Sequence, residues 1–311
     1  MAEKEEIARA LGEMGQDSAV LTKSNIAHLV ATGHTWLSLR EVPGVHLQAK
    51  RTSDGIAAEL TVSEGARIEN PVHLCVGVLE KRGDQRINIA IHLEARSAAT
   101  FMAHCFFPSA EKVLHAMDAV VDLGREAELR FLEGHYHGPF GGASVLPKAD
   151  VHVGPRARYV SDFSLTTGRV GQLYIDYNVE AEEEALAEMT TRIFGHATDD
   201  IRIRERVALA GKRSRSLIKI RVAVEDQASA DVSGITEGRE EGARGHVDCV
   251  EIVKDQAVAN AVPIVKVTHP LAKVTHEAAI GSVDKKQLET LMAHGLTPAQ
   301  AVDMVVTGML R

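Results

Sequence analysis

The chain has 311 residues, of which 45% are hydrophobic and 25% charged, a composition typical of a globular protein with a substantial core. Its formal net charge of −8 gives no electrostatic reason to bind nucleic acid or an anionic membrane surface. No apolar run approaches the roughly 18 residues that a membrane-spanning helix needs, and the charged N-terminus does not resemble a secretory leader. We therefore expect a cytoplasmic protein.

We divide the chain into an N-terminal helical or irregular segment (1–55), a β core (56–280) and a C-terminal helical segment (281–311). Within the first segment, residues 3–15 and 24–32 are expected to form helices. The three cysteines of the chain are scattered and odd in number, which argues against a disulfide framework.

The β core repeats one short pattern. A few alternating apolar residues are followed by a turn with Gly or charged residues, then by a small residue. The small residues are Ala66, Ala99, Ala127, Ala157, Ser214, Ala228 and Ala257. Their spacing gives a period of about 29 residues, with a half-step near 14. Short strands at this period favour a parallel β-helix, in which each winding stacks on the next. A β-sandwich is the alternative, although the strand region is long for one sandwich.

Helices interrupt or follow this core at two places. The acidic segment 180–193 is expected to be a helical interruption with a solvated face. At the C-terminus, one helix starts at Ser282 or Asp284 and ends at Gly295, and a second has Thr297 as its N-cap and Pro298 in its first turn. The apolar side chains of this hairpin include Leu288, Leu291, Met292, Leu296, Val302, Met304 and Val305. From the pattern alone, the hairpin covers the end of the coil, docks a partner, or does both.

The segment "EGHYHG" is the first of four groups of residues that can ligate a metal. Glu133, His135 and His137 lie in it, and His-x-His on a strand places both imidazoles on one face. These residues could hold zinc, or the histidines could simply line a solvent or interface face.

The other three groups are less specific. His246, Asp248 and Cys249 form "HVDC". The pairs His73/Cys75 and His104/Cys105 have apolar surroundings, which favours burial in the core. His276 and Glu277 lie where the β pattern gives way to the C-terminal helices. Adjacent residues on a strand point to opposite faces, so that pair needs irregular backbone to reach one ion.

Several common motifs are absent from the sequence. It contains no G-x-x-x-x-G-K-[ST] phosphate loop, no dinucleotide-binding G-x-G-x-x-G between a strand and a helix, no C-x-x-C and no H-E-x-x-H. The chain therefore has no nucleotide-hydrolysing loop of its own.

Residues 245–310 resemble the C-terminal half of the SufB and SufD proteins of iron–sulfur cluster assembly. The most telling pieces are the dipeptide Asp248-Cys249, "AVP" at 261–263, "HEA" at 276–278 and the "QL…LM..GL…A..M…G" tail. A weaker likeness extends upstream to about residue 90 through "HYHGPFGG". The chain lacks most of the N-terminal region of bacterial SufB, and so looks like a compact, archaeal-type, SufB-like member.

The resemblance implies a right-handed parallel β-helix with N-terminal helices and a C-terminal helical hairpin, in agreement with the repeat. It also implies a scaffold rather than an enzyme, forming a homodimer through the β-helix. A SufC-like ABC ATPase would bind the C-terminal helices, so the apolar hairpin becomes a docking surface. The iron–sulfur cluster would be transient, with none stably bound after purification in air.

The resemblance also carries over three residues as cluster ligands. Cys249 matches the scaffold cysteine, although the stretch from it to His276 is one residue shorter than in bacterial SufB. His276 matches a histidine of both SufB and SufD, and Glu277 a glutamate typical of SufB. A thiolate with imidazole and carboxylate suits a cluster that must be released. Cys105 is a candidate for the upstream sulfur-accepting cysteine only by residue type.

Two other classes of protein remain as alternatives. A metal-dependent β-helix enzyme would bind zinc through the His135 and His137 motif, with an open position for substrate. The membrane component of an ABC transporter is disfavoured because the sequence has no membrane span.

Overall fold

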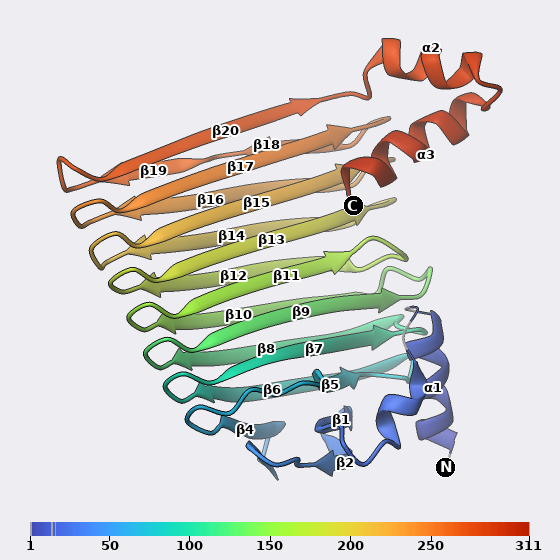
Figure 1. Cartoon of the computed structure of the whole chain (residues 1–311). Helices are drawn as coiled ribbons and strands as arrows, with labels where there is room; N and C mark the ends of the chain where they lie inside the picture. The colour runs from blue at the N-terminus through green and yellow to red at the C-terminus, as the bar shows by residue number, and fades with distance from the viewer. Residues whose placement is uncertain (1, 14, 16, 311) are drawn as a thin grey trace.

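Successive strands alternate between two sheets, so the chain winds as a parallel β-solenoid (Figure 1). The computed structural model describes residues 2–13, 15 and 17–310. Apart from the pairs β1/β2 and β3/β4, which are antiparallel, the ladders of both sheets are parallel. The predicted β-helix is therefore confirmed. The β-sandwich alternative is wrong, because the strands pair in parallel with the next winding.

The first sheet contains, in spatial order, β2 (Thr35–Arg40), β1 (His28–Thr32), β5 (Val72–Gly77), β7 (Ala98–Phe107), β9 (Glu128–His137), β11 (Arg158–Leu165), β13 (Leu186–Gly195), β15 (Arg215–Val224), β17 (Arg244–Val253) and β20 (Lys273–Gly281). The second contains β18 (Val258–Ala261), β16 (Ser229–Gly238), β14 (Asp200–Leu209), β12 (Gly171–Ala181), β10 (Ala143–Val153), β8 (Lys112–Leu123), β6 (Arg82–Leu93), β4 (Ile56–Val62) and β3 (Val45–Arg51), with β19 (Ile264–Val267) also paired to β16. The inward side chains of the two sheets form one continuous apolar core.

The turns that lead from the second sheet to the first explain the repeat. Most hold a charged residue with positive φ, followed by a small buried residue that lets the chain bend tightly. The positive-φ residues are Arg96, Glu126, Arg156, Glu184 and Arg213, and the small residues are Ser97, Ala127, Ala157, Ala185 and Ser214. Opposite charges stack from winding to winding, as in the ion pairs Arg156–Glu126 and Arg213–Glu184.

The structure also corrects the assignment of the repeat. Ser97, not Ala99, follows the positive-φ residue of its turn. Ala228 and Ala257 belong to the opposite set of turns, behind Asp226 and Asp255. The half-step near 14 residues arises because each winding has two turns.

In the described part of the chain, the helices that flank the solenoid are α1 (Ala2–Glu13), the 3₁₀ helix η1 (Ser18–Leu21), α2 (Lys285–Ala293) and α3 (Pro298–Met309). The helix expected at 3–15 is confirmed as α1, with residue 14 outside the described residues. The C-terminal caps are confirmed as well. Asp284 caps α2, Gly295 follows it with φ +94°, and Thr297 forms a capping box ahead of Pro298.

Two helix predictions are wrong. Residues 24–32 contain β1, whose five residues are all buried because one face lines the core and the other lies beneath α1. Burial on both faces removes the alternation that marks a strand. Residues 180–193 contain the end of β12 and most of β13, and the acidic run at 182–184 is the turn between them. The division at 55/56 and 280/281 stays a prediction.

Both α1 and α3 pack on the outer face of the first sheet. Ile7 and Leu11 of α1 contact Cys75 and Phe106, whereas Val306 of α3 lies against β15. By contrast, α2 has no buried residue. Within the described part of the chain, no helix is long and apolar enough to cross a membrane.

Candidate functional site

The three predicted ligands lie on two neighbouring strands at the last winding. β17 carries Cys249 and β20 carries His276 and Glu277, and the two strands pair in parallel. In their register Val247 lies opposite His276, and Cys249 lies opposite Ala278. Residues 27 positions apart in sequence are thereby brought to adjacent strands, one winding apart.

The register assigns the ligands to different faces of the sheet. Paired residues of parallel strands point to the same side, so His276 shares the inner face with Val247 and Cys249. Glu277 lies opposite Asp248, on the outer face. Cys249 is fully buried, whereas His276 and Glu277 are exposed. Cys249 and His276 therefore share one face within a single chain, and Glu277 faces the other way.

The Cys249 thiol lies in an environment that disfavours its charge. Burial raises the pKa of Cys249 to about 12, with the carboxylates of Glu251, Glu205 and Asp248 adding to the effect and Arg221 opposing it. The thiol is therefore protonated at neutral pH in the free chain. A bound cation would be needed to make it a thiolate ligand.

Glu251 is an inward residue that the sequence analysis missed. It lies two positions after Cys249 on β17, is 1% exposed, and both its carboxylate oxygens lack a hydrogen-bond partner. Burial raises its pKa to about 7, with Asp248 adding to the effect and Arg221 opposing it. The spacing Cys-x-Glu on a strand was the signal that could have revealed it.

Residues on the outer face of β17 form hydrogen bonds with the two neighbouring strands. Arg221 on β15 donates one hydrogen bond of 3.0 Å to the Asp248 carboxylate and another of 3.0 Å to the Asp248 backbone carbonyl. The His246 ring lies 2.8 Å from the Thr275 hydroxyl on β20. Asp248 thus ties β17 to β15 and His246 ties β17 to β20, whereas Val247 and Cys249 of "HVDC" point to the core.

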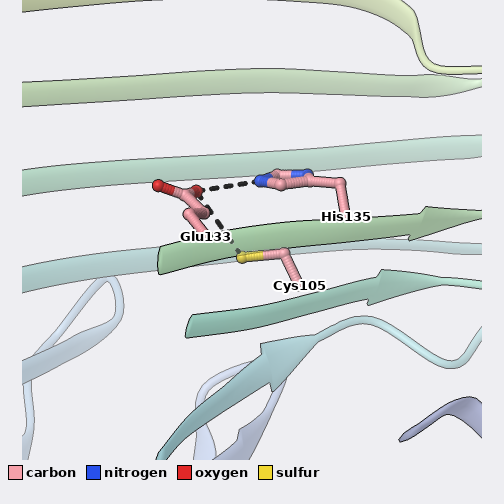
Figure 2. A group of neighbouring side chains, drawn as sticks. All are labelled: Cys105, Glu133 and His135. Atoms are coloured by element: carbon pink, nitrogen blue, oxygen red, sulfur yellow. Dashed lines mark hydrogen bonds and ion pairs between the residues drawn. The ribbon is translucent and has the colours of Figure 1, made fainter. Parts of the chain in front are cut away.

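The weaker candidates form a second group, deep inside the solenoid (Figure 2). Cys105 on β7 lies opposite His135 on β9, and Glu133 lies two positions before His135. The Glu133 Oε1 atom is 2.8 Å from His135 Nε2 and 3.8 Å from Cys105 Sγ. His137 shares this inward face, as the His-x-His spacing predicted, and its ring stacks on that of His135.

This second group is enclosed. Cys105, Glu133, His135 and His137 are all buried, with exposures from 0% to 6%. A catalytic zinc site needs an open position that a substrate can reach. The structure therefore gives no support to the zinc-enzyme alternative.

Burial is confirmed for the remaining histidine and cysteine candidates. Cys75 lies in the apolar cluster beneath α1, and the His73 and His104 rings stack with 5.3 Å between their centroids. Burial, followed by the neighbouring His73, lowers the pKa of His104 to about 4. These histidines are neutral core residues at neutral pH.

Exposed apolar side chains gather on the last winding and the segments that join its strands. They are Val258, Val262, Ile264, Val265, Val267, Leu271 and Ile280. β20 is the final strand of the first sheet, and β18 and β19 end the second, so their outer backbone edges have no neighbouring strand. An open edge with apolar side chains is a surface on which another chain can pair.

The C-terminal hairpin also leaves apolar surface uncovered. Met292 and Met304 are 43% and 51% exposed. A groove runs between α2, α3 and β17, and Leu291, Val305 and Ile252 are among its lining residues. Leu288, Leu296 and Val302 are partly buried.

Comparison with known proteins places this geometry in context. Residues 80–309 match the family model described as "SUF system FeS cluster assembly, SufBD core domain". The chain is 38% identical over 267 residues to an iron–sulfur cluster assembly SufBD family protein of Methanocaldococcus jannaschii, covering 86% of this chain and 84% of that protein. It is 30% identical over 308 residues to a SufBD family protein of Pyrococcus horikoshii, covering 99% and 94%. The likeness to SufB of Bacillus subtilis is 28% over 71 residues, or 22% of this chain and 15% of that protein.

Proposed function

The chain belongs to the SufBD family of the SUF system for iron–sulfur cluster assembly, and on that premise we propose that it is the scaffold on which a nascent cluster is built. In this proposal the scaffold is a homodimer without enzymatic activity of its own. A SufC-like ABC ATPase binds it and controls assembly. Iron and sulfide are the cargo, which the scaffold holds and then releases.

The observation that carries the proposal is the open last winding, where the three matched residues lie beside exposed apolar surface. A two-fold axis at this end would pair like edges of the two chains and cover residues such as Ile264 and Ile280. His276 and Glu277 lie on the edge strand itself, so each would come close to the partner chain. The interface would then hold ligands from both copies.

The division of the ligands between two faces fits such an interface. Cys249 and His276 of one chain offer sulfur and nitrogen from the inner face, and Glu277 offers oxygen from the outer face. A thiolate holds iron and sulfide firmly, whereas imidazole and carboxylate exchange more readily. Such a mixed set suits transient binding. The dimer also supplies, from a second copy, the ligands that one chain cannot aim at the same point.

The proposed ATPase contact is the groove between α2 and α3. α2 has no buried residue in the isolated chain, Met304 lines the groove and remains exposed, and Met292 on α2 is exposed as well. A helix that buries so little gains little stability from its own chain. We assign its apolar face to the ATPase, which supplies the nucleotide chemistry that this sequence lacks.

Anaerobic reconstitution with iron, sulfide and the ATPase tests the cluster site. The wild type is expected to gain charge-transfer bands between roughly 320 and 420 nm, as thiolate- and sulfide-bound iron does. Cys249→Ala should lose most of this absorption, and His276→Ala and Glu277→Ala should lose part of it. Cys75→Ala is the matched control, because Cys75 is a buried thiol beneath α1, distant from β20. Equal spectra for Cys249→Ala and Cys75→Ala would reject the site.

The state of assembly is tested separately. Sedimentation equilibrium should give a dimer of this chain at micromolar concentration, carrying two copies of the ATPase. A chain that stays monomeric at that concentration with its ATPase present would reject the homodimer. If the chain instead forms a complex with a different SufBD-like chain, the assembly is a heterodimer and the homodimer proposal is wrong.

A further inference from the structure

We propose that Cys105, Glu133 and His135 form a second metal site, sealed inside the solenoid, which holds one thiophilic divalent cation such as Zn²⁺ or Fe²⁺. This site is separate from the cluster site of the last winding. Several windings lie between them, because β11, β13 and β15 stand between β9 and β17 in the first sheet. The proposal uses residues that the proposed cluster site does not need.

The three donor atoms already converge. One ligand atom from each of Cys105, Glu133 and His135 lies within 4.8 Å of the other two, and Glu133 Oε1 is 2.8 Å from His135 Nε2 and 3.8 Å from Cys105 Sγ. Ligands around a tetrahedral ion, with bonds of about 2.0–2.3 Å, stand roughly 3.3–3.8 Å apart. Small rotations of the Glu133 and His135 side chains would therefore bring the three atoms onto one ion. Figure 2 shows the three side chains meeting from neighbouring strands.

The outer atoms of these ligands have partners of their own. The Tyr177 hydroxyl donates a hydrogen bond of 3.3 Å to Glu133 Oε2, and His135 Nδ1 lies 3.4 Å from His137 Nε2. Phe163 packs against the His135 ring with 4.7 Å between centroids. In protein metal sites, the non-ligating atoms of carboxylate and imidazole ligands are typically hydrogen-bonded in this way. The contacts leave Glu133 Oε1 and His135 Nε2 facing the thiol.

The charge of the group also favours a cation. Among the described residues, Glu133 forms no ion pair with any lysine or arginine, and its hydrogen-bond partners are Cys105, His135 and Tyr177. By comparison, the buried Asp199 carboxylate is paired with Arg169. A buried carboxylate without a counter-charge is costly. A divalent ion would balance the carboxylate together with a Cys105 thiolate, leaving the site neutral.

Because the site is enclosed, we expect a structural rather than a catalytic role for the ion. No substrate reaches these residues, so the ion ties β7 to β9 in the middle of the core rather than taking part in turnover. It would be taken up as the chain folds, because the finished core offers no open path in the described part of the chain. Binding to the folded chain alone raises its apparent stability.

The three cysteines of the chain allow a direct test. A Cys75→Ala/Cys249→Ala double variant keeps Cys105 as its single thiol and cannot build the cluster site. We would refold this variant anaerobically with Co²⁺, remove free metal, and measure bound cobalt and the optical spectrum. The expected result is about one Co²⁺ per chain, a thiolate-to-cobalt charge-transfer band in the near ultraviolet, and visible bands of cobalt held by protein ligands. The melting temperature should also exceed that of the metal-free protein.

Replacement of the ligands completes the test. In the same background, Glu133→Gln and His135→Gln should reduce bound cobalt at least tenfold, whereas His104→Gln, another buried histidine of the same region, should leave it unchanged. If the ligand variants do not fold, the double variant alone decides. A folded double variant with no bound cobalt, or with cobalt but no thiolate band, would overturn the proposal. Failure here leaves the cluster site untouched, since Cys249 is absent throughout.

Discussion

The two ends of the solenoid are built from similar strands but finish differently. At the N-terminal end, each sheet closes with an antiparallel strand, and α1 covers the outer face, so every residue of β1 is buried. The edge strand β3 presents charged residues such as Lys50 and Arg51. At the C-terminal end, every residue of β19 is exposed and β20 is almost entirely so. Charged edges discourage pairing with another chain, whereas apolar open edges invite it.

The same contrast separates the two groups of residues that could ligate a metal. Cys105, Glu133 and His135 lie within the closed part of the solenoid, whereas His276 and Glu277 lie on its open edge. A sealed group suits an ion that stays. An edge group suits a cargo that must arrive and leave. If both proposals hold, similar residue types serve different purposes according to their distance from the open winding.

The largest expected effect comes from placing charge on the open end. Val258→Asp/Leu271→Asp changes two side chains that are 64% and 63% exposed, so the isolated fold should survive. In the proposed dimer these carboxylates would be buried without partners. We expect the dimer dissociation constant to rise at least a thousandfold, or about 4 kcal/mol, in sedimentation velocity. Val120→Asp, 55% exposed on the outer face of β8, is the control and should stay dimeric. An unchanged dimer in the double variant would mean that chains meet elsewhere.

The next prediction compares the stability contributed by α1, which packs on the solenoid, with that of α2, which has no buried residue. Leu11→Ala removes a fully buried side chain of α1 and should lower the free energy of unfolding by about 2–5 kcal/mol in urea titrations. Met292→Ala on the unburied α2 should change it by less than about 0.5 kcal/mol without the ATPase. With the ATPase present, only Met292→Ala should weaken the complex. A large loss of stability from Met292→Ala alone would show that α2 is part of the fold rather than a docking surface.

The sequence predicted the solenoid because its signals are local and repeated. The caps at Asp284 and Thr297 and the small residue behind most turns depend on a few neighbours; the structure confirms the caps and the period and moves only some of the small residues to other turns. The two helix errors have different causes, one non-local and one local. At 24–32, α1 buries the second face of β1, and nothing within the segment reveals that cover. At 180–193, the acidic turn was read as part of a helix.

The candidate sites were predicted in composition but not in geometry. The 30-residue difference between Cys105 and His135 equals one winding, so the period alone could have paired them. Which face Cys249 and Glu277 occupy depends on the register of β17 against β20. That register is an offset of 29 residues, the same as between β15 and β17, so the period of the repeat could have shown that Ala278 rather than His276 lies opposite Cys249. Glu251 was missed because a single buried carboxylate has no signature beyond its alternation with Cys249.

The smallest expected effect is a pH dependence from the covered end. Burial, then the neighbouring His73, lowers the pKa of His104 to about 4 in the folded chain, below its unfolded value of about 6.5. The neutral ring therefore contributes stability that is fully present above pH 6.5 and is lost as the pH falls towards 4. The loss is at most about 1.4 kcal/mol per pH unit for one such group. His104→Gln should follow a shallower slope than the wild type in urea titrations between pH 7 and pH 5. Equal slopes for the wild type and His104→Gln would mean that the acid sensitivity does not come from this buried ring, and the covered end would then owe none of its stability to keeping His104 neutral.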